Sequence, residues 1–133
     1  MRFALLLLVF TAAHASDLAA IKSDPNPDKR ADRALIHANE LVDEARKHPS
    51  ASTLNEIRES VDLCRESLAG SGKSARRNPK YFKRAELATR QIIRRLENLR
   101  QDLGANERGG VEQLLSHLHD VHDELLDGIM RKK

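Results

Sequence analysis

The sequence predicts an all-α protein: an antiparallel up-down four-helix bundle that follows a cleaved signal peptide. Apolar residues recur at steps of three and four in four successive segments, which is the period of an amphipathic helix. The chain has one Tyr, three Phe and no Trp, so its core must be built from Leu, Ile, Val and Ala, as is typical of helical bundles. Short connections between the four segments favour antiparallel neighbours.

The first fifteen residues have the pattern of a secretory signal peptide. Arg2 supplies a positive charge, residues 5–10 form a short apolar run, and Ala13-His14-Ala15 places small residues where a signal peptidase cleaves. The apolar run is too short to cross a membrane as a helix. We therefore expect an exported protein, periplasmic or secreted, that is soluble after cleavage and does not span a membrane.

This cleavage divides the chain into three parts. A signal peptide is expected over 1–15, a flexible N-terminal leader over 16–25, and a four-helix bundle domain over 26–133. Within the leader, residues 17–22 fit either a helical turn or a disordered segment. At roughly 118 residues, the cleaved chain is long enough to bury a core as one domain.

The first long helix is expected from Pro27 to about His48. Asn26 suits the N-cap, Pro27 the first helical position, and Asp28 the positive end of the helix. The helix is expected to end before Pro49, because proline disfavours helical geometry in the residue that precedes it. Its apolar stripe consists of Ala31, Ala34, Leu35, Ala38, Leu41, Val42 and Ala45.

The second helix is expected to end at Gly70, which is a natural C-terminal cap. Thr53 and Glu56 have capping-box spacing at its start, although Ser50 and Ser52 are alternative caps. The apolar positions alternate steps of three and four, as in the seam of a coiled coil. They are Leu54, Ile57, Val61, Cys64 and Leu68.

The third and fourth helices complete the bundle. Asn78-Pro79 repeats the start signal of Asn26-Pro27, and the third helix is expected to end at Gly104. The fourth is expected to begin between Asn106 and Val111, because Gly109-Gly110 weakens its first turn. The apolar stripes of the two helices are Phe82, Ala85, Thr89, Ile92, Leu96, Leu99 and Leu103, and Val111, Leu114, Leu115, Leu118, Val121, His122, Leu125 and Ile129.

Charge is distributed unevenly along the chain. The net charge is only +3, but cations predominate from Lys73 to Arg100 and acids predominate in the last helix. Two interpretations remain open: solvated faces of neighbouring helices that attract one another, or a surface that binds carboxylates or phosphates. The candidate residues for binding a protein partner or an anionic envelope surface are Lys73, Arg76, Arg77, Lys80, Lys83, Arg84, Arg90 and Arg94.

The histidines offer an alternative function, a metal site or a b-type haem site. Inward-facing groups of neighbouring helices hold metals and cofactors in bundles, and His122 is the candidate axial haem ligand, with His37 or Met130 opposite. The competing interpretation is a core His122 hydrogen-bonded to Thr89, with His117 at the surface and His37 directed away from the centre of its stripe. The candidate metal ligands are His37, His119, His122 and Asp123.

No catalytic constellation stands out, and we expect no enzyme activity and no cofactor. Residues 67–74 read Ser-Leu-Ala-Gly-Ser-Gly-Lys-Ser, but a phosphate-binding loop requires Gly in place of Ser67, a preceding strand and an immediately following helix. Cys64 is the only cysteine, so it cannot form an internal disulfide, and its place in the apolar seam predicts burial. The scarcity of aromatic residues argues against single-stranded nucleic acid as a ligand.

Together these patterns predict an exported, non-enzymatic helical bundle that works as a binding module. Its partner is expected to engage the basic segment of the third helix and the loop before it. The acidic fourth helix is expected to orient the approach of that partner. A monomer and a homodimer are both compatible with the sequence.

Overall fold

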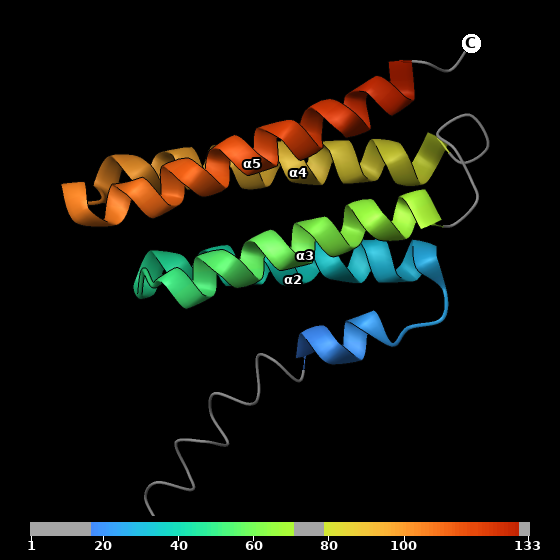
Figure 1. The fold of residues 1–133 in the computed structure, drawn as a ribbon, viewed down its shortest axis with the longest axis horizontal. Coiled ribbons are helices and arrows are strands. Elements are labelled where there is room, and N and C mark those ends of the chain that lie inside the picture. Colours follow the sequence, from blue (N-terminus) through green and yellow to red (C-terminus); the bar gives the residue numbers. More distant parts are fainter. Residues whose placement is uncertain (1–16, 71–78, 131–133) are drawn as a thin grey trace, which may run out of the picture.

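The computed structural model describes residues 17–70 and 79–130, and this part of the chain is helical without strands. A short helix over 17–22 precedes the four long ones (Figure 1). The long helices are α2 (Pro27–Lys47), α3 (Ala51–Gly70), α4 (Pro79–Asp102) and α5 (Ala105–Met130). The predicted all-α class is confirmed.

The four long helices form two hairpins that pack on each other (Figure 1). α2 and α3 run antiparallel in the first hairpin, and α4 and α5 run antiparallel in the second. Between the hairpins, α2 lies beside α4 and α3 lies beside α5, and both of these pairs run parallel. The expectation that all neighbours are antiparallel therefore does not describe the contacts between the hairpins.

Loop length explains this difference. Helices that follow one another through a tight turn must be neighbours, but eight residues separate Gly70 from Pro79. A segment of that length reaches about 26 Å when extended, whereas the diagonal of a four-helix bundle with 10 Å between neighbours is about 14 Å. The connection can thus join α3 and α4 across the diagonal, which a prediction from short loops did not anticipate.

The 17–22 helix packs against the first hairpin, below α2 in Figure 1. Leu18 and Ile21, three residues apart on one side of it, are only 5% and 6% exposed. Of the two alternatives that the sequence left open for this segment, the structure shows the helical one. Within the expected leader of residues 16–25, the 17–22 helix therefore buries two large aliphatic side chains.

The helix starts use the caps that the sequence offered. The Asn26 side chain accepts hydrogen bonds from the backbone N–H groups of Asp28, at 3.0 Å, and Lys29, at 3.3 Å, as predicted. At the start of α3, Ser50 Oγ accepts from the Thr53 N–H at 3.1 Å. Ser50 is therefore the cap among the three alternatives.

α5 begins earlier than predicted, at Ala105. The Gly104 carbonyl accepts hydrogen bonds from the N–H groups of Glu107 and Arg108, at 3.2 and 3.0 Å, which close the first turn. Gly110 lies against Leu54, whose Cδ1 is 3.2 Å from the position that a Cβ would occupy. Close packing of Leu54 thus favours Gly at position 110 despite its low helix propensity.

The core consists of the predicted aliphatic stripes. The largest fully buried side chains include Ile57, Leu68, Ile92, Leu96 and Leu118. Cys64 is buried as expected, with 1% of its surface exposed, and burial raises the pKa of its thiol to about 12. Within residues 17–70 and 79–130, no helix combines the length and apolar character needed to cross a membrane.

Candidate binding surface

Four cations and one leucine line the side of α4 that faces solvent. The spacing of alternating threes and fours places these residues on one side of the helix, opposite the buried Ala85, Ile92 and Leu96. We call this set the outward stripe of α4. Its members, all exposed and none of them acidic, are Lys80, Lys83, Leu87, Arg90 and Arg94.

The cations of this helix differ in whether another side chain of the protein already pairs with them. Arg90 donates to both carboxylate oxygens of Glu86, at 2.9 and 2.5 Å. Arg84 pairs with Asp32 of α2 at 3.2 Å, and the Tyr81 ring lies below its guanidinium. Lys80 Nζ lies 5.9 Å from the centre of the same ring.

Lys83 and Arg94 are the cations available for an external ligand. Both are exposed, and neither forms a hydrogen bond or ion pair with another residue in the part of the chain that the structure describes. The predicted binding residues Lys73, Arg76 and Arg77 lie outside the described residues. The structure thus brings Lys80, Lys83, Arg90 and Arg94 together in one stripe and places Arg84 toward α2.

The Arg90–Glu86 pair persists over a wide pH range. The hydrogen bonds from Arg90 lower the pKa of Glu86 against the opposing effect of burial, and a hydrogen bond from His122 lowers it further. The same pair raises the pKa of Arg90. Arg90 is therefore held in place at the edge of the outward stripe, while its charge is largely compensated.

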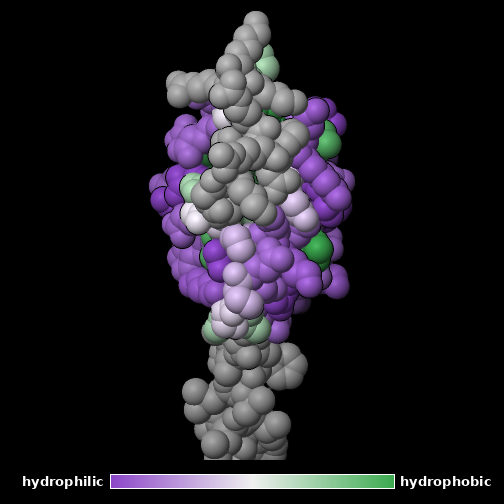
Figure 2. All heavy atoms as spheres, turned by 90° about the vertical axis from the view of Figure 1, so that its right-hand side faces the viewer, coloured by the Kyte–Doolittle hydropathy of each residue, from purple (hydrophilic) through white to green (hydrophobic). Residues whose placement is uncertain are grey.

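Acidic residues gather on α5, the helix that packs beside α4. α5 contains six Asp and Glu against a single Arg, whereas α4 contains seven Lys and Arg against three Asp and Glu. The carboxylates of Asp120, Asp123, Glu124 and Asp127 surround a shallow depression on α5. Figure 2 looks onto the end of the bundle where α4 begins, and hydrophilic side chains predominate among the described residues visible there.

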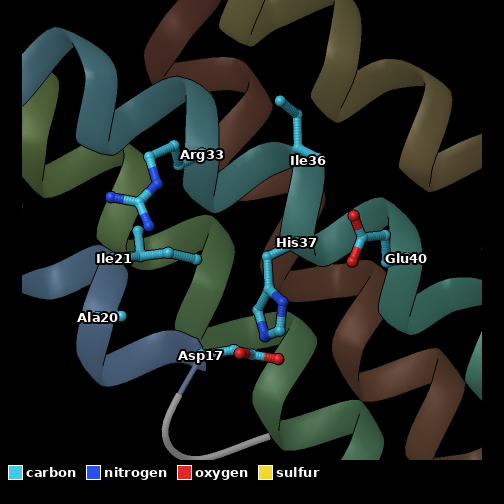
Figure 3. A pocket seen from close by; sticks show the side chains of 7 residues that line it. All are labelled: Asp17, Ala20, Ile21, Arg33, Ile36, His37 and Glu40. Carbon is cyan, nitrogen blue, oxygen red and sulfur yellow. The ribbon is translucent and has the colours of Figure 1, made fainter.

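The half-buried and buried histidines contact carboxylates of neighbouring helices. His37 is buried, with 7% exposed, and its Nε2 lies 3.1 Å from Glu56 of α3. His37 lies beside the apolar stripe of α2 and faces the 17–22 helix, which covers this side of α2 (Figure 3). His119 is exposed, and His122 Nε2 lies 3.0 Å from Glu86 with Asp123 at 4.0 Å from its Nδ1.

These positions do not converge on a common point. Among the described residues, no three His, Cys, Asp or Glu side chains are arranged to hold a metal ion. For haem, His37 and His122 are engaged with carboxylates of different helix pairs, and Met130 is 74% exposed. Of the candidate ligands, His119, His122 and Asp123 lie close together on α5, whereas His37 lies on α2 and contacts Glu56.

The predicted hydrogen bond between Thr89 and His122 is also wrong. Glu86, one turn before Thr89 on α4, takes the imidazole instead. A carboxylate reaches further than a threonine hydroxyl and accepts a stronger, charge-assisted hydrogen bond. The Thr89 Oγ1 is buried and has no hydrogen-bond partner among the described residues.

Three histidine–carboxylate contacts between helices were missed from the sequence. His37–Glu56 joins α2 to α3, His122–Glu86 joins α5 to α4, and His117 Nε2 lies 2.6 Å from Asp62 of α3. His117 is therefore half-buried in a contact rather than free at the surface. With 20 acidic residues in the chain, no spacing rule selects these three carboxylates.

A cleft of about 310 Å³ separates the 17–22 helix from α2 (Figure 3). Figure 3 shows the His37 imidazole pointing toward Asp17. Arg33, on the same side, pairs with Asp24 at 3.0 Å. A hydrogen bond from the backbone of Asn26 and then the Arg33 contact lower the pKa of Asp24. Arg33 and His37 are thus already engaged with carboxylates, so the outward stripe of α4 is the stronger candidate site.

No family model matches the chain, and no curated protein or solved structure matches it either. Function must therefore be inferred from the arrangement of its own side chains.

Proposed function

We propose that this protein is an exported, non-enzymatic binding module that engages an anionic partner through the outward stripe of α4. The single observation that carries this proposal is the exposure of Lys83 and Arg94. Both lack a counter-charge among the described residues, on a stripe without any acidic side chain. Export follows from the signal-peptide pattern of residues 1–15.

The stripe suits a partner with carboxylates spaced along a helix or an edge. Lys80 and Arg94 are fourteen residues apart, which corresponds to about 21 Å along the axis. A linear row of cations creates a local positive potential that attracts and aligns an acidic surface. The acidic face of α5 repels that surface and so restricts the direction of approach.

Between the two kinds of anionic partner, the stripe favours a protein over a lipid surface. Leu87, with 56% of its surface exposed, is the only large apolar residue in the stripe. Stable attachment to a lipid surface draws on a broad apolar face in addition to cations. A single exposed leucine is sufficient for a contact with another protein.

Catalysis lacks support in the described residues. The only thiol, Cys64, is buried and has a raised pKa, so the reactive thiolate is suppressed. The half-buried and buried histidines are each held by a carboxylate of a neighbouring helix. These groups serve the packing of the bundle.

The test compares two charge-reversal variants of equal net charge. K80E/K83E/R94E removes the stripe, and the control K22E/K29E/K47E reverses three exposed lysines of the 17–22 helix and α2. We expect the wild-type protein and the control to be retained on heparin resin and the stripe variant to elute early. Retention should fall steeply with added salt.

Two outcomes would contradict the proposal. Equal retention of all three proteins would show that the stripe binds no polyanion. Co-sedimentation of the wild-type protein, but not the stripe variant, with vesicles of anionic lipid would assign the stripe to a membrane surface instead of a protein.

A further inference from the structure

Exposed residues follow the same spacing on α4 and α5, with three cations on α4 and an acidic residue at each end of the α5 row. In each helix three exposed residues are separated by steps of seven and then four, which keep them on one side. The α4 row consists of Lys83, Arg90 and Arg94. The α5 row consists of Glu112, His119 and Asp123.

Contacts with the first hairpin show that the α4 row faces away from it. Arg84 pairs with Asp32, and Arg95 donates to Asn39 of α2 at 2.8 Å. Lys83 and Arg94 each precede one of these two arginines by one residue, so they are turned from the α2 side by about 100°.

The α5 row faces away from the first hairpin by the same reasoning. Glu124 pairs with Arg65 of α3 at 3.5 Å, and His117 pairs with Asp62. Asp123 precedes Glu124 by one residue and is turned from the α3 side by about 100°. Both rows therefore belong to the outer face of the α4/α5 hairpin.

The two rows lie at matching heights along the hairpin. Glu86 meets His122 at 3.0 Å, and the Phe82 ring lies 3.7 Å from the position of a Cβ on Gly128. Counting outward from these contacts places Lys83 within about a turn of Asp123, and Arg94 within about a turn of Glu112. None of these four residues pairs with another of them in the described part of the chain.

We propose that a second copy of this chain docks on the outer face of the α4/α5 hairpin, with α4 of each copy against α5 of the other. The two copies are related by a two-fold axis parallel to the helices. This axis places α4 of one copy opposite α5 of the other, and each residue keeps its position along the axis. Lys83 then faces Asp123 of the second copy, and Arg94 faces Glu112. The symmetry repeats each pair, so the interface contains four complementary contacts.

This inference rests on the proposed function, because it names a second copy as the acidic partner of the outward stripe. An interface composed largely of exposed ion pairs is weak and sensitive to salt. Leu126, 40% exposed and three residues beyond Asp123, adds apolar area at the end of the α5 row. Since Lys83 and Arg94 serve both roles, dimer formation and the binding of another polyanion exclude each other.

The experiment uses a charge swap in purified protein. K83E/R94E makes both facing rows acidic, and E112K/D123K makes both facing rows basic. Each variant alone should sediment as a monomer at concentrations at which the wild-type protein sediments as a dimer at low salt. An equimolar mixture of the two variants should restore the twofold mass, because both contacts of the mixed dimer are again complementary.

The control K22E/K29E carries the same charge change as the first variant and should remain a dimer. A wild-type protein that stays monomeric at all concentrations at low salt would overturn the inference, as would a mixture of the variants that stays monomeric. If the wild-type protein is monomeric but is still retained on heparin resin, the dimer proposal fails and the proposed function stands. The failures of the two proposals are therefore distinguishable. Circular dichroism of each variant checks that these exposed substitutions preserve the helical fold.

Discussion

Glu86 is the residue at which the surface and the core of the second hairpin meet. Its carboxylate accepts hydrogen bonds from Arg90 on the same helix and lies 3.0 Å from the His122 imidazole on α5. Only 7% of the surface of Glu86 is exposed. A charge in such a position is tolerated because both partners compensate for the loss of water.

The variant E86Q should lower the free energy of unfolding by about 1–3 kcal/mol at neutral pH. The folded-state pKa of Glu86 is lowered from 4.5. Its stabilising contribution is therefore fully present above about that value and is lost as the pH falls through the lower folded-state pKa. Urea unfolding of the wild-type protein and E86Q should show a difference that shrinks in acid.

The control for this effect is E59Q on α3, where the glutamate is exposed and has no ion-pair partner among the described residues. Its free energy of unfolding should stay within about 0.5 kcal/mol of the wild-type value. A difference for E86Q that stays constant down to strongly acidic pH would show that the carboxylate charge is not what stabilises the fold.

Thr89 is the opposite case, a buried polar group without compensation. Its hydroxyl has no hydrogen-bond partner, and burial of an unpaired hydroxyl costs about 1–3 kcal/mol in proteins. The nearly isosteric variant T89V should therefore raise the free energy of unfolding by about 1–2 kcal/mol. Urea unfolding measures this gain, provided that the dependence of the free energy of unfolding on urea concentration stays the same as in the wild-type protein. A lower free energy of unfolding for T89V would contradict this account.

At the scale of elements, the 17–22 helix is a structural part of the bundle. Ile21 is 6% exposed and belongs to the hydrophobic core, whereas Ile36 on the neighbouring α2 is 59% exposed. I21A should lower the free energy of unfolding by about 2–4 kcal/mol, because a buried isoleucine leaves a cavity when truncated. Thermal or urea unfolding should show I36A close to the wild-type protein, and equal effects of the two variants would contradict the packing of this helix.

The long helices were predictable because their signals are local. Asn26 before Pro27 determines where α2 begins, and the apolar periodicity of α4 determines which residues face the core. The start of α5 was missed because Gly110 packs against Leu54, a contact 56 residues away in the chain. The same holds for the 17–22 helix, which has too few residues to form without the first hairpin.

At the scale of the whole molecule, each pair of neighbouring helices is joined by a polar contact in addition to the core. Histidines join three of the pairs, and Arg95 joins α4 to α2 through Asn39 and Asp43. In the candidate site too, features set within one helix could be predicted, whereas contacts between helices could not. The outward stripe follows from spacing on one helix, whereas the Arg84–Asp32 pair and the contacts of His37, His117 and His122 with carboxylates depend on which helices pack together.

Processing at the N-terminus connects the whole chain to its proposed export. Cleavage between Ala15 and Ser16 would leave Leu18 and Ile21 in the protein, and both are part of the folded structure. We therefore expect protein recovered from outside the cytoplasm to begin at Ser16 and to keep the stability of the bundle. N-terminal sequencing should read Ser-Asp-Leu-Ala.

A cleavage site beyond Ile21 would be incompatible with this structure, because it would remove two buried side chains and expose His37 together with the α2 surface beneath them. Protein cleaved there should unfold at a lower temperature than protein that begins at Ser16. Intact chains with Met1 at the N-terminus, recovered only from the cytoplasm, would contradict export itself. Mass spectrometry of the protein from separate cell fractions distinguishes these three results.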